Sequence, residues 1–264
     1  MKVVLTIAGS DSSGGAGIQA DLKTFEAFGV FGCTVLTVLT AQNTQGVTEI
    51  QKVPASFVRA QIEAVLNDFD VCAIKIGMLY NNAIINEVRE AIKHLTVPIV
   101  FDPVFVSKAG SKLLKEDAIE NLKSLFPYVT LITPNLHEAK VLFGYEANED
   151  FTLKSLAHLP CSVVIKNHKV FVNNHFRSVD ILWEDSQTKR FDTPYLEINS
   201  FHGTGCSYSS AIVANLALQK SLEESIVMAK KFVYLAIKNA PSIGKGSGPI
   251  AHKTAGEICL IEKV

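Results

Sequence analysis

Short apolar runs alternate with stretches of helical periodicity along most of this chain, and that alternation restricts the possible folds more than any other feature. Strand-like apolar runs are Val3–Ala8, Thr34–Thr40, Cys72–Ile76, Pro98–Phe101, Val129–Ile132 and Ser162–Lys166. Helical periodicity covers Ala16–Phe28, Pro54–Leu66, Ala83–Leu95, Glu116–Leu125 and Asn135–Phe143. Because strands buried on both faces are continuously apolar, the pattern predicts an α/β fold with a mostly parallel sheet between two helical layers.

The last third of the chain has a different pattern. Hairpin-like strands are expected at Val170–Asn173, Arg177–Trp183 and Thr188–Phe191, and two apolar helices, Thr204–Leu218 and Leu222–Asn239, are expected to close the chain. No internal repeat, low-complexity linker or block of like charge interrupts the 264 residues. A single domain spanning residues 1–264 is the simplest prediction.

Composition narrows the expected partners. The chain has 25 Lys and Arg against 26 Asp and Glu, a net charge of −1, so neither nucleic acid nor an anionic membrane is expected as the main partner. No apolar run reaches the length of a membrane span, and the first strand is too short for a signal peptide. The five cysteines are widely spaced without a CxxC pair, which argues against a disulfide framework or zinc site and for a reducing cytoplasm: Cys33, Cys72, Cys161, Cys206 and Cys259.

Polar and glycine-rich segments follow the predicted strands one after another. In an open parallel sheet, ligands bind beyond the carboxyl ends of the strands. Several distinctive segments at that edge predict a binding site more strongly than any one of them alone. These segments are Gly9–Gly17, Gln42–Thr44, Gly77-Met78, Asp102-Pro103 and Thr133–Asn135.

The segment Asn199–Ser207 brings a glycine-framed turn to the start of an apolar helical pattern and places Cys206 at the expected first helical position. Unpaired amides and the positive end of the helix dipole suit a phosphate or a developing oxyanion there. Such a position also lowers a thiol pKa, so Cys206 could act as a base or nucleophile. A helix cap with an incidental buried cysteine explains the same residues equally well.

The loop after the first strand contains Gly15–Ala20, which fits the loose dinucleotide pattern GxGxxA. A Rossmann site also needs an acidic residue at the end of the next strand, where this chain has Ala41-Gln42-Asn43. No Walker A sequence occurs. We therefore favour a loop whose glycines let a flat substrate approach the backbone closely, with a flexible connection as the alternative.

Four side chains near these loops are candidates for binding a heteroaromatic ring. Gln42 offers a donor and an acceptor to a ring edge, although a strand-end turn residue is the simpler interpretation. Met78 could stack on a ring or belong to the core. Asp11 and Asp21 could bind a ligand, but Asp21 lies inside a predicted helix, where most aspartates are solvated.

Other polar residues suit a magnesium–phosphate site. Asp102 and the segment Asn135–Glu138 lie where magnesium ligands would be expected, since Mg²⁺ takes one or two carboxylates and keeps waters. The helix dipole alone also explains Glu138. Lys166 ends an apolar strand and could meet a phosphate as a point charge.

Three further features have simpler interpretations. His168 and His202 are expected to be surface or turn histidines rather than catalytic bases. The late loop Gly244–Pro249 could close over a nucleotide or be only a turn.

Taken together, these segments resemble the hydroxymethylpyrimidine/phosphomethylpyrimidine kinase family of thiamine biosynthesis, within the ribokinase-like superfamily. They occur in family order over nearly the whole chain. The resemblance implies a three-layer α/β/α fold, a homodimer, and ATP- and Mg²⁺-dependent phosphorylation of 4-amino-5-hydroxymethyl-2-methylpyrimidine and then of its monophosphate. The segments that carry it are Ala8–Thr24, Ala41–Thr44, Lys75–Leu79, Asp102–Val104, Ile132–Ala139, His202–Cys206 and Gly244–Pro249.

The resemblance also implies roles for individual residues. Cys206 stands where most ribokinase-like sugar kinases have an aspartate base, and the Gly203, Thr204, Gly205 and Cys206 amides would neutralise charge on the transferring phosphoryl. The ring would be bound by Gly9, Asp21, Gln42, Met78 and Val104, with Gln42 at its edge. Asn135, Lys166 and Lys245 would lie near the nucleotide, and Asp102 and Glu138 near magnesium.

One departure from the family falls beside the expected nucleotide site, where Asn167-His168-Lys169 replaces the usual glycine pair after Lys166. Three alternatives remain. A pyridoxine/pyridoxal kinase shares the glycine–cysteine turn, although Gln42 within Ala-Gln-Asn-Thr favours the aminopyrimidine. An NAD-type oxidoreductase lacks its ribose-binding acid, and a pyrimidine-sensing binding protein would not need the intact turn at Gly203.

Overall fold

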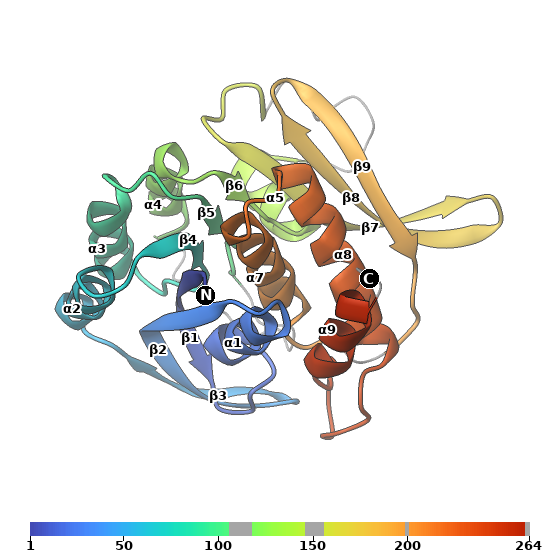
Figure 1. Ribbon diagram of the computed structural model, residues 1–264, viewed down its shortest axis with the longest axis horizontal. Helices are drawn as coiled ribbons and strands as arrows, with labels where there is room; N and C mark the ends of the chain where they lie inside the picture. The colour runs from blue at the N-terminus through green and yellow to red at the C-terminus, as the bar shows by residue number, and fades with distance from the viewer. Residues whose placement is uncertain (106–117, 146–155, 199–200, 262–264) are drawn as a thin grey trace.

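The computed structural model describes residues 1–105, 118–145, 156–198 and 201–261. Its centre is a sheet in the order β3-β2-β1-β4-β5-β6-β7-β8-β9 (Figure 1). Adjacent strands from β2 through β7 are parallel, whereas β3, β8 and β9 pair antiparallel. The strands are β1 (Val3–Asp11), β2 (Phe31–Asn43), β3 (Gly46–Lys52), β4 (Val71–Ile76), β5 (Ile99–Phe101), β6 (Leu131–Ile132), β7 (Ser162–Val172), β8 (His175–Glu184) and β9 (Gln187–Pro194).

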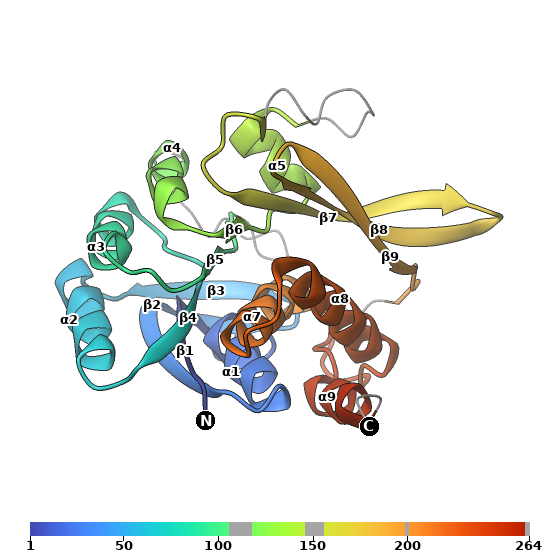
Figure 2. The ribbon, with the colours of Figure 1, turned by 45° about the horizontal axis from the view of Figure 1, so that its top comes forward.

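Helices cover both faces of the sheet, which confirms the predicted three-layer α/β arrangement (Figure 2). One layer contains α2 (Ala55–Leu66), α3 (Asn82–Ile92), α4 (Ile119–Leu122) and the 3₁₀ helix Lys123–Tyr128. The opposite layer contains α1 (Gly17–Ala27), α7 (Thr204–Ala217), α8 (Leu222–Lys238) and α9 (His252–Ile261). The short helix α5 (Leu136–Phe143) follows β6.

Strand β1 shows why two cores form. Successive side chains of a strand point to opposite faces of the sheet. Leu5 and Ile7 are accordingly buried against α2 and α3, while Val4 is buried in the core that Phe25 of α1 and Phe232 of α8 complete. The apolar character of the run therefore reflects burial on both faces, as predicted.

Several predicted element boundaries were wrong. Strand β3 was missed because it is a polar edge strand with no buried residue. Strand β7 continues through residues 167–172 because it pairs with β8 in a hairpin that projects beyond the body (Figure 1). Helix α9, which packs Gly256 against Ala27 of α1, follows the two helices expected to close the chain. Glu116, the predicted start of another helix, lies outside the described residues.

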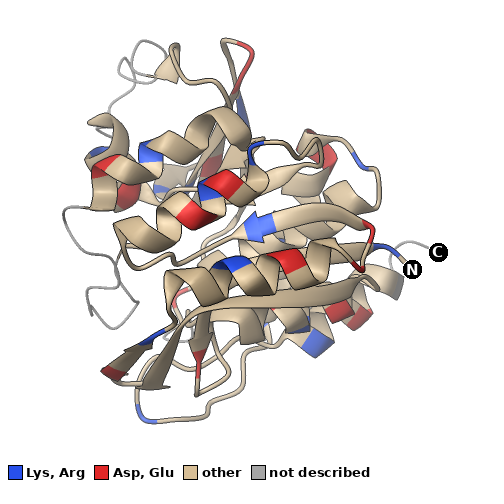
Figure 3. Cartoon of the chain, turned by 90° about the vertical axis from the view of Figure 1, so that its left-hand side faces the viewer, with Lys and Arg blue, Asp and Glu red and all other residues tan. Residues whose placement is uncertain are grey.

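The surface carries both signs of charge. Figure 3 shows basic and acidic residues mixed over the helices that face the viewer, as a net charge of −1 suggests. Along the described residues, no helix has the length and apolar character needed to cross a membrane.

Candidate active site

A cavity of about 320 Å³ opens at the carboxyl ends of the parallel strands. Most of the residues that the sequence singled out lie in its wall, although they come from seven separate segments of the chain. Asp21 and Lys245 are absent from this wall. Those that line it are Gly9, Gln42, Met78, Val104, Asp102, Asn135, Glu138, Lys166, Gly203, Thr204, Gly205 and Cys206.

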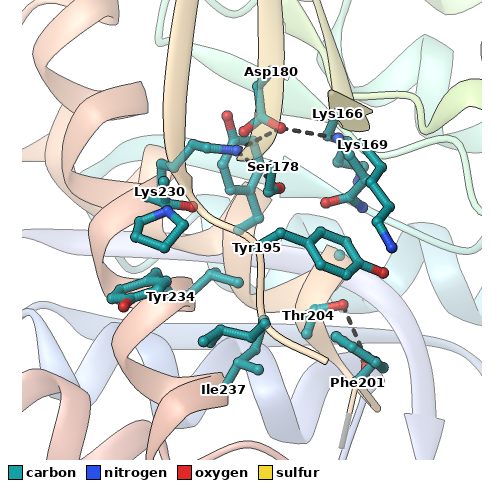
Figure 4. A pocket seen from close by; sticks show the side chains of 17 residues that line it. Lys166, Lys169, Ser178, Asp180, Tyr195, Phe201, Thr204, Lys230, Tyr234 and Ile237 are labelled. Atoms are coloured by element: carbon teal, nitrogen blue, oxygen red, sulfur yellow. Dashed lines mark hydrogen bonds and ion pairs between the residues drawn. The ribbon is translucent and has the colours of Figure 1, made fainter. Parts of the chain in front are cut away.

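A second cavity of about 290 Å³ adjoins the first and shares Lys166, Asn167, Thr204 and Gly205 with it. Figure 4 shows this second cavity, with Lys166 and Thr204 in its wall and α8 contributing Tyr234 and Ile237. Sequence reasoning missed most of these residues, because they sit on separate elements and read as ordinary core or surface positions. No local motif marks them.

The turn before α7 separates the two cavities. Gly203 has a φ of 83° and is the N-cap of α7, so Thr204 is the first helical residue and Cys206 the third. This corrects the predicted placement of Cys206. A Cβ on Gly203 would lie 1.8 Å from the carbonyl oxygen of Gly15, so only glycine allows the two loops to meet. Asn199 and Ser200, at the start of the predicted segment, lie outside the described residues.

The predicted lowering of the Cys206 pKa is wrong. Burial raises the pKa of this thiol to about 11, and the nearby Lys75 ammonium only partly opposes the effect. Desolvation penalises a thiolate more than the Lys75 ammonium and a hydrogen bond from the Gly17 backbone stabilise it. Cys206 is therefore a neutral thiol near pH 7.

Asp21 lies beneath the cavity rather than in its wall. Its carboxylate accepts hydrogen bonds from the Lys75 ammonium at 2.8 and 2.9 Å, and from the hydroxyls of Thr6 and Ser210 at 2.7 Å. Asp21 and Lys75 are both fully buried. Burial lowers the pKa of Lys75, but the Asp21 carboxylate and, more weakly, other acidic neighbours that include Asp102 together raise it above its ordinary value. Lys75, which reaches the cavity wall, thus keeps its positive charge.

A second buried ion pair lies where the two cavities meet. The Lys166 ammonium donates to Oδ1 of Asp102 at 2.6 Å, and the Thr133 hydroxyl donates to the same oxygen at 3.0 Å. Burial lowers the pKa of Lys166, yet Asp102 and then Glu138 raise it above its ordinary value overall. Lys166 therefore presents a fixed positive charge where both cavities meet.

The carboxylates of Asp102 and Glu138 suit a magnesium ion that arrives with phosphate. Glu138 forms a capping box with Asn135 at the start of α5, with hydrogen bonds of 2.8 and 3.0 Å. Within the described ranges, no group of three acidic, histidine or cysteine side chains is arranged to hold a metal. Mg²⁺ usually takes one or two carboxylates together with substrate phosphates and waters. The residues present therefore fit a metal–nucleotide complex rather than a metal held by protein ligands alone.

His202 and Asp11 form a contact that the sequence did not reveal. Nε2 of His202 lies 2.7 Å from Asp11, whose carboxylate also accepts from the amides of Ser13, Gly15 and Ala16. Although burial opposes it, the hydrogen bond from His202 and those from the loop hold the pKa of Asp11 well below its usual range. Asp11 thus connects the glycine-rich loop after β1 to His202, the residue before Gly203.

The expected surface positions of His202 and His168 are wrong, although His202 does lie in the turn that the Thr204 amide closes onto the Phe201 carbonyl oxygen. Both side chains are buried. His168 lies with Nε2 3.0 Å from the Tyr145 hydroxyl, within the cluster around β7. A lone histidine in a polar segment carries no sequence signal for such a partner, since Tyr145 is distant along the chain.

Asn167, the first residue of the departure after Lys166, has a left-handed backbone conformation. Its φ is 70°, in the left-handed region that glycine adopts readily and asparagine tolerates. Its amide donates to Asp180 at 2.9 Å. The backbone directly after Lys166 therefore has a conformation that glycine favours, although Asn167 stands there.

A three-layer α/β fold with a glycine turn at a helix N-terminus, beside two adjoining cavities, is the arrangement of a small-molecule phosphotransferase. The pattern of the phosphomethylpyrimidine kinase family matches residues 11–251. The chain belongs to this family.

Individual relatives and solved structures support this family membership. A hydroxymethylpyrimidine/phosphomethylpyrimidine kinase of Haemophilus influenzae is 40% identical, with 96% of this chain and 97% of the relative covered. An ADP complex of Bacillus subtilis pyridoxal kinase has a TM-score of 0.84 at 34% identity, covering 96% and 98% of the two chains. Phosphomethylpyrimidine kinase of Clostridium difficile has a TM-score of 0.76 at 39% identity, covering 90% and 100%. These neighbours confirm the ribokinase-like fold.

Proposed function

We propose that this enzyme transfers phosphoryl groups from ATP to 4-amino-5-hydroxymethyl-2-methylpyrimidine and then to its monophosphate, in thiamine biosynthesis. The observation that carries the proposal is the meeting of two cavities at Thr204 and Gly205, directly after the Gly203 turn. An acceptor hydroxymethyl group in one cavity and a nucleotide in the other would face each other across this turn. The family membership supports the same reaction.

The acceptor cavity suits a flat aminopyrimidine. Met78 and Val104 offer apolar surface to the ring faces, and Gln42 offers its amide to the ring edge. The Gln42 amide is oriented by its Oε1, which accepts from the Thr40 hydroxyl at 3.0 Å. Gly9 has room only for a hydrogen, because a Cβ there would lie 2.9 Å from Val38. Asp21 would act indirectly, by holding Lys75.

The nucleotide is assigned to the second cavity. Its apolar end on α8, around Val233, Tyr234 and Ile237, suits a base, and its other end reaches Lys166 and the Gly203 turn. Lys245 lies outside both cavities, so its proposed place near the nucleotide is not supported by the cavity walls.

Transfer depends on charge neutralisation more than on a strong base, because phosphoryl transfer has a loose transition state. The amides at the start of α7 and the Lys166 ammonium would stabilise charge on the transferring group. Bound magnesium would neutralise phosphate charge, and Asp102 and Glu138 would hold it. The neutral Cys206 thiol lies close to the acceptor without being a ready base.

We extend the proposal to the working form of the enzyme, a homodimer in the cytoplasm. The family resemblance supports the dimer, and the free cysteines among the described residues suit a reducing compartment. Light scattering would distinguish the 28.7 kDa chain from its dimer.

Pyridoxal phosphorylation is the second candidate. It is favoured by one observation, the higher TM-score to the Bacillus subtilis pyridoxal kinase than to the Clostridium difficile phosphomethylpyrimidine kinase, 0.84 against 0.76. Sequence identity instead favours the Clostridium difficile phosphomethylpyrimidine kinase, at 39% against 34% for the Bacillus subtilis pyridoxal kinase. Both acceptors are flat heteroaromatics with a hydroxymethyl arm, so one cavity could serve both.

A coupled ATP-consumption assay with Mg²⁺ tests the proposal by comparing hydroxymethylpyrimidine, its monophosphate, pyridoxine and pyridoxal. Turnover of both pyrimidines is the expected result. Preference for pyridoxine and pyridoxal would transfer the assignment to the second candidate. Absence of turnover with all four would favour a binding protein.

Replacing Cys206 with alanine should lower kcat by less than about tenfold, because a positioned general base is generally worth 10²–10⁴-fold and this thiol is protonated near pH 7. Steady-state kinetics from pH 6 to 9 provide the measurement. Cys72→Ala, at a half-buried cysteine remote from the cavities, is the matched control. A loss of more than about a hundredfold on Cys206→Ala alone would make the thiol the base.

A further inference from the structure

The late glycine-rich loop, residues 244–249, lies outside the walls of both cavities. It therefore does not take the predicted place over a nucleotide in this structure. Instead it runs between two parts of the active site that are far apart in the sequence. One is the turn joining β2 to β3, which contains Thr44, and the other is the segment Phe201–Gly203 before α7.

Thr44 makes three hydrogen bonds to this loop. Its Oγ1 accepts from the amides of Lys245 and Gly246 at 3.1 and 3.0 Å, and its carbonyl oxygen accepts from the amide of Ser247 at 3.0 Å. Three successive amides of the loop are thus bound to one residue. A valine side chain has nearly the shape of threonine but cannot accept a hydrogen bond, so two of the three bonds depend on the hydroxyl.

Glycines allow this close approach. A Cβ on Gly246 would lie 2.1 Å from the carbonyl oxygen of Thr44, and one on Gly244 would lie 2.4 Å from its methyl carbon. Gly244 also has a φ of 82°, which side chains disfavour. Contact with Thr44 therefore explains Gly244 and Gly246 without any ligand.

The other end of the loop is hydrogen-bonded to the two residues that precede Gly203. The carbonyl oxygen of Gly248 accepts from the amide of His202 at 3.2 Å, and the Ser247 hydroxyl accepts from the amide of Phe201 at 3.3 Å. His202 and Pro249 also form an isolated parallel bridge. The two residues before Gly203 are thus bound to the same loop that binds Thr44.

We propose that loop 244–249, anchored by the Thr44 hydroxyl, is a brace that sets the distance between acceptor recognition and phosphoryl transfer. This inference rests on the proposed function, in which Gln42 binds the ring and the Gly203 turn stabilises the transferring group. Gln42 is two residues before Thr44, and His202 directly precedes Gly203. Because reacting groups must be placed within about 1 Å, a loosened brace costs rate even when both ligands bind. Thr44 is thus a positioning residue.

Kinetics of Thr44→Val and Thr44→Ser test the brace. Thr44→Val should lower kcat by about tenfold with the KM for ATP changed by less than about twofold, since it removes positioning without touching the nucleotide cavity. Thr44→Ser keeps the acceptor oxygen and should restore most of the rate. The matched control is Thr48→Val, which removes the hydroxyl that donates to the Ala41 carbonyl on the same hairpin. Equal kcat in Thr44→Val and wild type, or equal losses in Thr44→Val and Thr44→Ser, would overturn the brace.

Amide hydrogen exchange provides a readout that needs no substrate. Peptides covering residues 201–207 should exchange faster in Thr44→Val than in Thr44→Ser, Thr48→Val or wild type, because the loop no longer holds the amides of Phe201 and His202. Unchanged exchange in Thr44→Val would also overturn the brace. If wild-type enzyme phosphorylates neither pyrimidine, the proposed function fails, while the exchange comparison still decides the brace.

Discussion

Replacing Gly203 with valine should lower kcat by more than about a thousandfold while pyrimidine binding is largely retained. The new Cβ would lie 1.8 Å from the carbonyl oxygen of Gly15, and the φ of 83° would be strained for any side chain. The turn must therefore move, and the amides at the start of α7 leave their places together. Loss of a single such donor already costs about 10²–10³ in kcat. Turnover assays and calorimetric titration with the pyrimidine would measure the two effects separately.

Gly29→Val is the matched control for backbone strain. Gly29 has a φ of 72°, but no atom lies within 4 Å of the Cβ position. This variant shares the unfavourable conformation without the collision, so it should lose stability and keep its kcat. Lost pyrimidine binding with normal turnover in Gly203→Val would contradict the proposed division between acceptor cavity and anion-binding turn.

Replacing Lys75 with methionine should lower the free energy of unfolding by about 3–5 kcal/mol, because it leaves the Asp21 carboxylate buried without its cation. Urea unfolding followed by circular dichroism would measure the change. Replacing both partners, as Asp21→Leu with Lys75→Met, should recover much of the loss, since buried ion pairs often exchange for apolar pairs at little cost.

The comparison for this prediction is Lys93→Met, which breaks a partly exposed ion pair with Glu90 on α3. Surface pairs typically contribute no more than about 1 kcal/mol. Equal destabilisation by Lys75→Met and Lys93→Met would show that the buried pair does not hold the floor of the cavity.

The order of strands and helices was largely readable from the sequence because it depends on local patterns. Continuous apolar runs mark strands buried on both faces, and β1 matched its prediction closely. Strand β3 and helix α9 were missed because neither shows a continuous apolar pattern. The first has no buried face, and the small, polar residues of the second obscure its packing against α1.

The sequence predicted which segments form the candidate site, but not which side chains contact one another within it. The segments could be collected because parallel strands bring their carboxyl ends to one edge of the sheet. The pairing of Asp11 with His202, across a sequence separation of 191 residues, has no local signal. The same holds for the second cavity, where Val233, Tyr234 and Ile237 read as one face of an ordinary helix.

By itself, the sequence determined the layered α/β fold, the family and the segments that meet at the site, because these follow from periodicity and from motifs within single segments. Tertiary structure alone decided the electrostatics. The Cys206 pKa rises to about 11 rather than falling, because elements distant in the chain shield the half-buried thiol from water. Asp21 holds Lys75 instead of a ligand, and loop 244–249 binds Thr44 instead of lining either cavity. Solvent exclusion and long-range hydrogen bonds exist only once the chain has folded.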